Sequence, residues 1–297
     1  VDAAGDLTLH AAGDQDISSV VAAASVAVAV SGTVGVGVSG AGVFAGNEIV
    51  TDVKAYIEGD FTTGDGIGIK ANSITLSAID SSRISAVAAS ASVAAAFGIG
   101  ATGVAVSIGV GMAHNTITAN VAAYITRVAD GVESTAGDVI LIATGNASIS
   151  AVAVAASIAF GGGFVGVDVS GGGADAHNVI LSTIDAYIDS SNVIAADDVS
   201  LTASNTADIY AIVVAATASV AGGFVGVGVS LGSSTASNLI GETSSPARVR
   251  AWISDSDVYA HEISIMATAN SVVDALVDVI SVALAGGFVG VGVSGVG

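Results

Sequence analysis

The hydrophobic and polar residues of this chain are arranged in patterns that predict strands. In residues 198–203, Val, Leu and Ala alternate with Ser and Thr, a period of two that is typical of a strand with one polar face. The polar residues 204–208 predict a turn, and residues 209–220, rich in β-branched residues and alanine, indicate a strand buried on both faces. No amphipathic stripe with the helical period occurs, so the pattern predicts an all-β fold.

Glycine marks the second half of this pattern. Gly222 and Gly223 interrupt the buried stretch and predict a turn or bulge. In residues 225–229 valine alternates with glycine, which would let another backbone or sheet approach the glycine face closely. The polar residues 232–238 come next and predict a surface loop of variable length.

The whole pattern recurs along the chain, which makes it a tandem repeat. The motif of residues 198–203 returns at residues 6–11, 73–78, 138–143 and 262–267. Three further markers keep the same order, and the glycines among them lie 60 to 68 residues apart. The markers are the glycines Gly35, Gly103, Gly166, Gly226 and Gly290, the asparagines Asn47, Asn115, Asn178 and Asn238, and the aromatic residues Tyr56, Tyr124, Tyr187 and Trp252. They predict about five units of about 64 residues each.

Repeated strands without helical crossovers stack most simply as a solenoid, in which each coil pairs with the next about 4.8 Å away. We therefore expect an all-β tandem-repeat β-solenoid, similar to a parallel β-helix. The expected units are 1–69, 70–135, 136–195, 196–258 and an incomplete unit at 259–297. The pattern leaves open one wide coil or three narrow coils per unit, and either handedness. No end unit has the polar character of a cap, so we expect a part of a longer chain or fibre.

Composition and charge narrow the function. The chain has 26 acidic and 6 basic residues and a net charge of -20, which excludes nucleic acid as a partner because phosphate binding needs clustered cations. The long uncharged stretches consist of Val, Ala, Ser and Gly and lack the flanking residues of membrane helices, so we do not expect transmembrane segments. The first residues are not a secretory signal, and we expect any export signal to lie outside this segment.

The Gly-Asp-Leu-Thr-Leu-His-Ala sequence at residues 5–11, its echoes at Asp138 and Asp198, and the Ala-, Val- and Gly-rich strands resemble giant repetitive bacterial surface proteins, the filamentous-haemagglutinin-like adhesins. The resemblance extends over all five units. It implies a right-handed parallel β-helix, export across an outer membrane, and a role in adhesion, biofilm or filament formation. The long apolar block that ends in Val-Gly-Val-Gly departs from the short coils of that family.

Three carboxylates are the candidates for cation binding. Asp168 replaces a glycine of its motif, and Asp274 and Asp278 share one face of a predicted strand. Such oxygen ligands suit Ca²⁺, so calcium remains open as a cofactor, and no other is expected. Without a neighbouring base, Arg or Lys, these carboxylates lack the partners of a catalytic pair, and water-facing or cation-paired aspartates are the better interpretation.

The remaining candidates favour structure over catalysis. His114 and His177 share a phase, but Gly46 and Ser237 occupy the equivalent positions, so a metal ladder would be incomplete. The aromatic markers predict a stacked packing column rather than a sugar-binding stripe. The pair Arg248 and Arg250 beside Trp252 is the one hint of an enzyme loop.

The sequence therefore predicts a structural protein and no enzyme, with no catalytic, cofactor-binding or metal-binding residues. We expect an elongated extracellular or cell-surface filament or stalk, with a role in adhesion, biofilm or cell-surface assembly. The expected partners are identical chains or adjacent repeats, and a host or matrix surface. The alternative is a carbohydrate-binding or carbohydrate-processing β-helix passenger domain.

Overall fold

The computed structural model describes residues 1–60 and 68–297, and in them the chain is all-β, with no helix. The strands form three sheets of eight, six and four strands. The eight-stranded sheet contains β1 (Leu7–Gly13), β2 (Asp16–Ser31), β5 (Ile74–Asp80), β6 (Arg83–Gly98), β9 (Val139–Gly145), β10 (Ser148–Gly162), β13 (Val199–Gly222) and β17 (Ile263–Gly286). The six-stranded sheet contains β3 (Val34–Glu58), β7 (Thr102–Thr126), β11 (Val165–Asp189), β14 (Val225–Ile240), β15 (Arg248–Ser254) and β18 (Val289–Val296). The four-stranded sheet contains β4 (Ile69–Ala71), β8 (Val132–Ser134), β12 (Asn192–Ile194) and β16 (Asp257–Tyr259).

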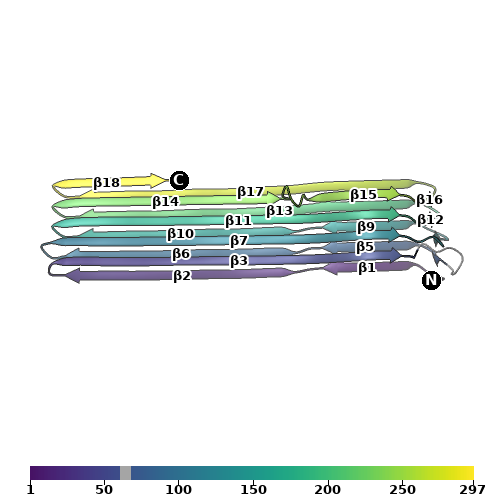
Figure 1. Cartoon of the computed structure of the whole chain (residues 1–297), viewed down its shortest axis with the longest axis horizontal. Helices are drawn as coiled ribbons and strands as arrows, with labels where there is room; N and C mark the ends of the chain where they lie inside the picture. The colour runs from purple at the N-terminus through teal and green to yellow at the C-terminus, as the bar shows by residue number, and fades with distance from the viewer. Residues whose placement is uncertain (61–67) are drawn as a thin grey trace.

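The strands stack in parallel, each on the equivalent strand of the next pass of the chain (Figure 1). In the six-stranded sheet, Gly35 pairs with Gly103, Gly103 with Gly166, Gly166 with Gly226, and Gly226 with Gly290. We number these passes as levels: β1–β3 are level 1, β5–β7 level 2, β9–β11 level 3, β13–β15 level 4, and β17 with β18 level 5. The parallel stacking is that of a β-helix or solenoid, in agreement with the all-β prediction.

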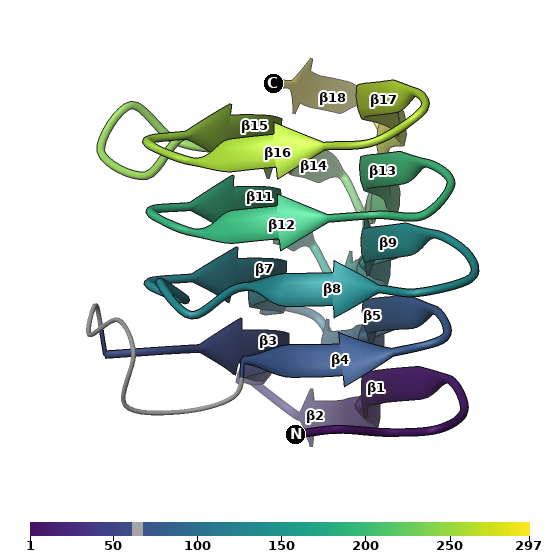
Figure 2. The same cartoon turned by 90° about the vertical axis from the view of Figure 1, so that its right-hand side faces the viewer.

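The solenoid is much longer along its strands than a narrow coil would be. Between Gly35 and its partner Gly103 the chain passes once through each of the three sheets. One long strand leads to a tight turn, a second long strand returns, and a short strand of the four-stranded sheet closes the path (Figures 1 and 2). Each pass of the chain therefore forms one wide coil and not three narrow coils, a choice that the sequence left open.

We call the two ends of this path the near half and the far half. The near half holds the four-stranded sheet and lies at the right of Figure 1, and the far half ends in the glycine turns at the left. The far half comprises residues 16–46, 83–114, 148–177, 208–237 and 272–297. The near half encloses a core of Ile, Leu and Val, including Leu76, Leu141 and Leu201, whereas the far half encloses mainly alanine, such as Ala153 and Ala215. The interior thus narrows from the three-sheet near half to a thin two-sheet far half.

Glycine allows this narrowing because it faces inward in the far half. A Cβ placed on Gly37 would lie 2.6 Å from the carbonyl oxygen of Ala95 on the opposite sheet, and one on Gly35 would lie 2.7 Å from that of Phe97. The sheets therefore meet with almost no side chain between them, as the valine–glycine alternation predicts. The valines of the same strands point outward, and Val36 is 56% exposed.

Two local predictions are wrong. Residues 204–208, predicted as a turn, continue β13, and residues 232–238, predicted as a loop, lie within β14. Residues 204–208 pair with strands of levels 3 and 5, and residues 232–238 pair with β11 of level 3. The ladder of parallel hydrogen bonds overrides the turn preference of single polar residues, which alternate between the interior and the outer face. The break in this region falls later, between Ile240 and Arg248.

Candidate functional site

The marker asparagines form a hydrogen-bonded ladder inside the solenoid. The Nδ2 atom of Asn47 donates to Oδ1 of Asn115, Asn115 donates to Asn178, and Asn178 donates to Asn238, each at 2.8 Å. Asn115 and Asn178 are almost completely buried. Because a register slip of one residue would turn these amides outward, the ladder specifies the register of the six-stranded sheet.

A second polar ladder lies deeper in the far half, and the sequence interpretation missed it. The hydroxyl of Ser92 donates to Ser39 at 3.0 Å, and that of Ser107 donates to Ser92 at 2.9 Å, so the bonds cross between the two sheets. Ser170 with Ser157 and Ser230 with Thr217 repeat the pairing at the next two levels. The signal was in the sequence, because the serine that ends each Val-Gly-Val motif keeps a constant phase. These residues join the two sheets through hydrogen bonds between their hydroxyl groups.

The aromatic markers form a column on the outer face of the six-stranded sheet in the near half. Ring centroids are 4.9 Å apart for Tyr56 and Tyr124, 4.8 Å for Tyr124 and Tyr187, and 4.4 Å for Tyr187 and Trp252, with interplanar angles of 8° or less. The flat faces therefore cover one another, and burial raises the pKa of Tyr124 and Tyr187. Arg250 lies over the Trp252 ring, 4.8 Å from its centroid. Sugar stacking needs an exposed ring face, and the faces of Tyr124 and Tyr187 are both covered by the neighbouring rings.

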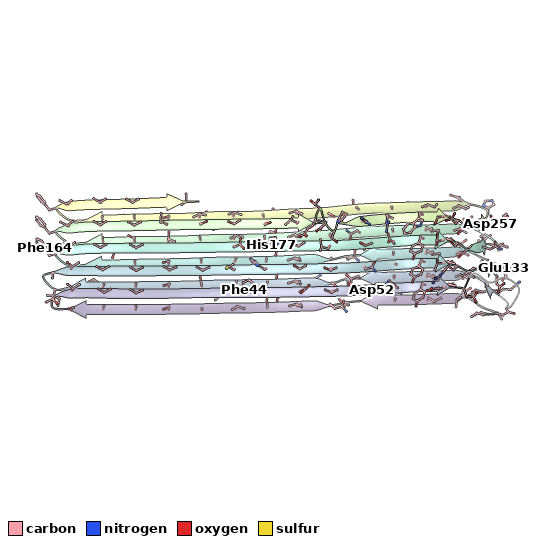
Figure 3. All side chains as sticks on the ribbon, viewed as in Figure 1. Phe44, Asp52, Glu133, Phe164, His177 and Asp257 are labelled. Carbon is pink, nitrogen blue, oxygen red and sulfur yellow. The ribbon has the colours of Figure 1, made fainter. Side chains whose placement is uncertain are left out.

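Charged groups flank the aromatic column in matched pairs. Arg250 makes two hydrogen bonds to the carboxylate of Asp185, at 3.0 and 2.8 Å, and the bond to Asp185 raises the pKa of Arg250. Lys54 Nζ lies 2.7 Å from Asp52, whose other oxygen accepts a bond from Asn120, and the bond to Asp52 raises the pKa of Lys54. Figure 3 shows that long side chains gather in the near half, around and beyond Asp52, whereas the far half carries mainly short ones, apart from aromatic residues such as Phe44, Phe164 and His177. The arrangement neutralises charge locally and presents no free acid–base pair.

Phenylalanines form a second column at the far turns, where Figure 3 labels Phe164. Centroids of Phe164 and Phe224, and of Phe224 and Phe288, are 5.1 Å apart, with nearly parallel rings. Phe164 is 56% exposed. The exposed edges of these rings give the far turns of the solenoid an apolar surface.

The histidines do not assemble a metal centre. His114 Nε2 lies 2.9 Å from Asp175 Oδ2, and its ring packs edge-on against Phe44 and His177. In residues 1–60 and 68–297, no group of three or more His, Asp or Glu side chains has the geometry to hold a metal ion. His114 and His177 thus lie together, as their phase predicts, but only one carboxylate joins them.

The three candidate aspartates do not lie together. Asp274 and Asp278 pair with Tyr210 and Val214 and lie on the outer face of the eight-stranded sheet. Asp168, by contrast, is 0% exposed and points between the two sheets, so the expectation of a water-facing or cation-paired side chain is wrong for this residue. Neither of its oxygens accepts a hydrogen bond of normal geometry within the described part of the chain. Burial raises its pKa to about 6, although the nearby amides of Gly161 and Ala105 lower it.

A short loop provides the most enzyme-like surface. Residues 241–247 separate β14 from β15, opposite only two residues of β11. A shallow hollow next to this loop is lined by His177, Ser237, Leu239, Glu242, Thr243 and Ser244. Arg248 and Arg250 lie in β15 beyond the loop, and the guanidinium of Arg250 is held by Asp185. The hollow therefore holds one imidazole, one carboxylate and the hydroxyls of Ser237, Thr243 and Ser244.

Comparison with family models, with curated proteins and with solved structures gives no match to this chain. Within residues 1–60 and 68–297, no helix has the length and hydropathy of a membrane span. The interpretation of the sites therefore rests on their geometry.

Proposed function

We propose that this chain is a structural segment of an elongated extracellular filament or stalk, in which units of about 64 residues stack coil upon coil. The observation that carries the proposal is the set of uninterrupted ladders along one axis: backbone pairs, asparagine amides and aromatic rings. Each ladder gains one equivalent rung per level from level 1 to level 4. Such an architecture supports extension of the same axis rather than a single enclosed site.

The exposed edge of level 5 supports end-on growth. Val273 and Val277 point toward the interior but are 51% and 44% exposed, whereas their partners on level 4, Ile209 and Val213, are 1% and 0% exposed. A further coil would bury these side chains and pair the free backbone groups of β17. Either an identical chain or an adjacent repeat would supply that coil.

Adhesion, biofilm formation or cell-surface assembly is the setting that we propose for the filament. The net charge of -20 and the absence of cysteine suit an extended, solvated polymer outside the cell. The resemblance to filamentous-haemagglutinin-like adhesins points the same way. The carbohydrate-binding alternative has less support, because the aromatic rings that would stack on sugars cover one another.

Electron microscopy and fibre diffraction of the purified chain test end-on stacking. We expect filaments that lengthen with protein concentration and a meridional reflection near 4.8 Å. Val277→Lys places a charge on the inner side of the open edge and is expected to abolish the filaments. Ile280→Lys, on the outer face of the same strand, is the matched control and should leave them intact. Monomeric particles at every concentration, or equal growth of Val277→Lys, would contradict the proposal.

A further inference from the structure

The part of the outer face of the six-stranded sheet that lies nearest the far turns is apolar and uncharged. We call it the ridged face, and it comprises the outward side chains of residues 34–42, 102–110, 165–173, 225–233 and 289–297. The one charged residue in these ranges, Asp168, points inward and is fully buried. The outward valines remain accessible to solvent, and Val38 is 64% exposed. A surface of this extent and character marks an interaction site.

The ridged face is corrugated with a period of two levels. One outward column contains, from level 1 to level 5, Gly40, Ile108, Gly171, Leu231 and Gly295, which the strand register places side by side. The next column contains Gly42, Val110, Gly173, Ser233 and Gly297. Odd levels therefore carry glycine and even levels carry a larger side chain in both columns. Ile108 and Leu231 are 51% and 53% exposed and form ridges on either side of the Gly171 trough.

Most of the trough glycines are not required by packing inside the molecule, Gly295 beside Leu231 being the exception. A Cβ on Gly42, Gly171 or Gly173 would meet no atom within 4 Å, whereas one on the inward Gly109 would lie 2.6 Å from the carbonyl oxygen of Ala156. Glycine within a strand costs about 0.5–1 kcal/mol relative to alanine. Outward glycine in a strand marks a place where something outside approaches closely. The troughs are therefore shaped for an occupant from outside the chain.

We propose that the ridged face binds the ridged face of a second copy of this chain. With a two-fold axis parallel to the strands, level 2 of one copy faces level 3 of the other, and level 1 faces level 4. Ile108 then enters the Gly171 trough of the second copy, and Leu231 enters the Gly40 trough. Every ridge meets a trough because opposed levels always differ in parity. This isologous contact is self-complementary, and it is lateral, so it extends beyond the end-on stacking proposed above and does not depend on it.

The area of this contact suffices for a specific dimer. Four opposed levels at about 4.8 Å and nine residues at about 3.3 Å cover about 600 Å² on each copy. The total of about 1,200 Å² reaches the lower limit of stable protein interfaces. The interface would be more apolar than an average one, since it contains Val, Ile, Leu and Gly almost throughout.

A second copy fits this face better than a lipid surface does. Fluid lipid chains need no alternation of ridges and troughs, and the face has no Lys or Arg at its border to bind anionic headgroups. The outer face of the eight-stranded sheet, by comparison, carries Asp274 and Asp278. The uncharged, corrugated face is therefore the one suited to its own copy.

A ridge-and-trough exchange tests the proposal, with dimerisation measured by sedimentation velocity. All variants carry Val277→Lys, so that end-on stacking is blocked whether or not it occurs in the unmodified chain. Gly171→Ile fills the trough, so that the new side chain meets Ile108 of the second copy, and we expect dimerisation to weaken at least tenfold. Adding Ile108→Gly exchanges the ridge and the trough and should restore it, because level 2 then offers glycine to the isoleucine of level 3.

Matched measurements separate folding and lipid binding from pairing. Ala216→Ile, on the outer face of the eight-stranded sheet, should dimerise as the parent does, and thermal melting should show all variants folded. Gly171→Ile that dimerises as tightly as the parent would overturn the proposal. So would an exchange variant as weak as Gly171→Ile alone. Flotation with phosphatidylcholine vesicles that captures the parent and Gly171→Ile equally, without dimers of either, would assign the face to lipid instead.

Discussion

Asp168 gives the sharpest test of how the interior of the far half is built. Its carboxyl group lies at a position where the paired residues of the adjacent levels have a methyl group or no side chain. Asp168 pairs with Ala105 on level 2 and Gly228 on level 4, and it is fully buried. Its carboxylate points at Gly161 on the opposite sheet, where an added Cβ would overlap it. Asp168→Gly restores the glycine that levels 1, 4 and 5 have at this position, and Asp168→Asn removes the charge at nearly constant shape.

The cost of this carboxylate follows from its pKa. Burial raises the pKa from 3.8 to about 6, a shift of about 2 units, and each unit corresponds to about 1.4 kcal/mol. The folded state therefore holds the proton more tightly than the unfolded state does. The free energy of unfolding should fall as pH rises from about 4 to about 6, by about 3 kcal/mol in total, and this loss stays constant at higher pH.

Urea denaturation between pH 4 and pH 8 measures this effect as a difference between variants. At pH 8 we expect Asp168→Gly and Asp168→Asn to unfold at higher urea concentration than the unmodified chain, and the difference should shrink toward pH 4. Asp278→Asn, which removes an outward carboxylate on level 5, is the control for the loss of one negative charge and should gain less stability at pH 8 than Asp168→Asn does. A stability difference that is the same at pH 4 and pH 8 would refute the reasoning, because the gain would then come from packing and not from the buried charge.

Two further substitutions probe the far half and the asparagine ladder. Gly37→Ala should lower the free energy of unfolding by about 1–3 kcal/mol, because its Cβ would lie 2.6 Å from the carbonyl oxygen of Ala95, whereas Gly42→Ala points into open space and should be neutral or stabilising. Equal effects in chemical denaturation would contradict the inward orientation of the glycine face. Asn178→Ala should cost about 1–3 kcal/mol by leaving buried amides unpaired, while Asn120→Ala, on the outer face, should cost less than about 1 kcal/mol. Thermal melts that do not distinguish the two would show that the ladder contributes no stability.

The sequence predicted much of the architecture because a solenoid converts periodicity directly into contact. Residues in the same phase, such as Asn115 and Asn178, become neighbours in the sheet and bond to each other. The failures have the same origin. Residues 204–208 and 232–238 look like turns when one unit is read alone. In the structure they pair with strands of other levels, residues 204–208 with β17 and residues 232–238 with β11. Tertiary pairing decided these segments, and local composition could not reveal it.

The candidate chemistry divided in a similar way. Phase alone placed Tyr124 and Tyr187 in contact, but only the structure shows that their faces overlap and leave no platform for a sugar. Asp168 is the opposite case. Its position in a glycine motif indicated an unusual residue. The direction of its side chain, however, depends on which face of the valine–glycine strand is inside, and the repeat pattern alone does not predict this.

The far half reverses the distribution of apolar residues that is usual in a globular protein, because small residues lie inside and larger ones face outward. This reversal accounts for the composition of the chain. Alanine and glycine fill its interior, as at Ala153 and Gly166, while valine and isoleucine face outward, as at Val38 and Ile108. Large apolar residues stabilise a protein only when they leave water, so the outward ones contribute little to an isolated solenoid. A strand with alanine and glycine inside therefore relies on the backbone ladder, and the lateral contact proposed above would bury its outer side. The hydrophobic content of 52% combined with only 4% aromatic residues is thus consistent with the end-on and face-to-face contacts that we propose.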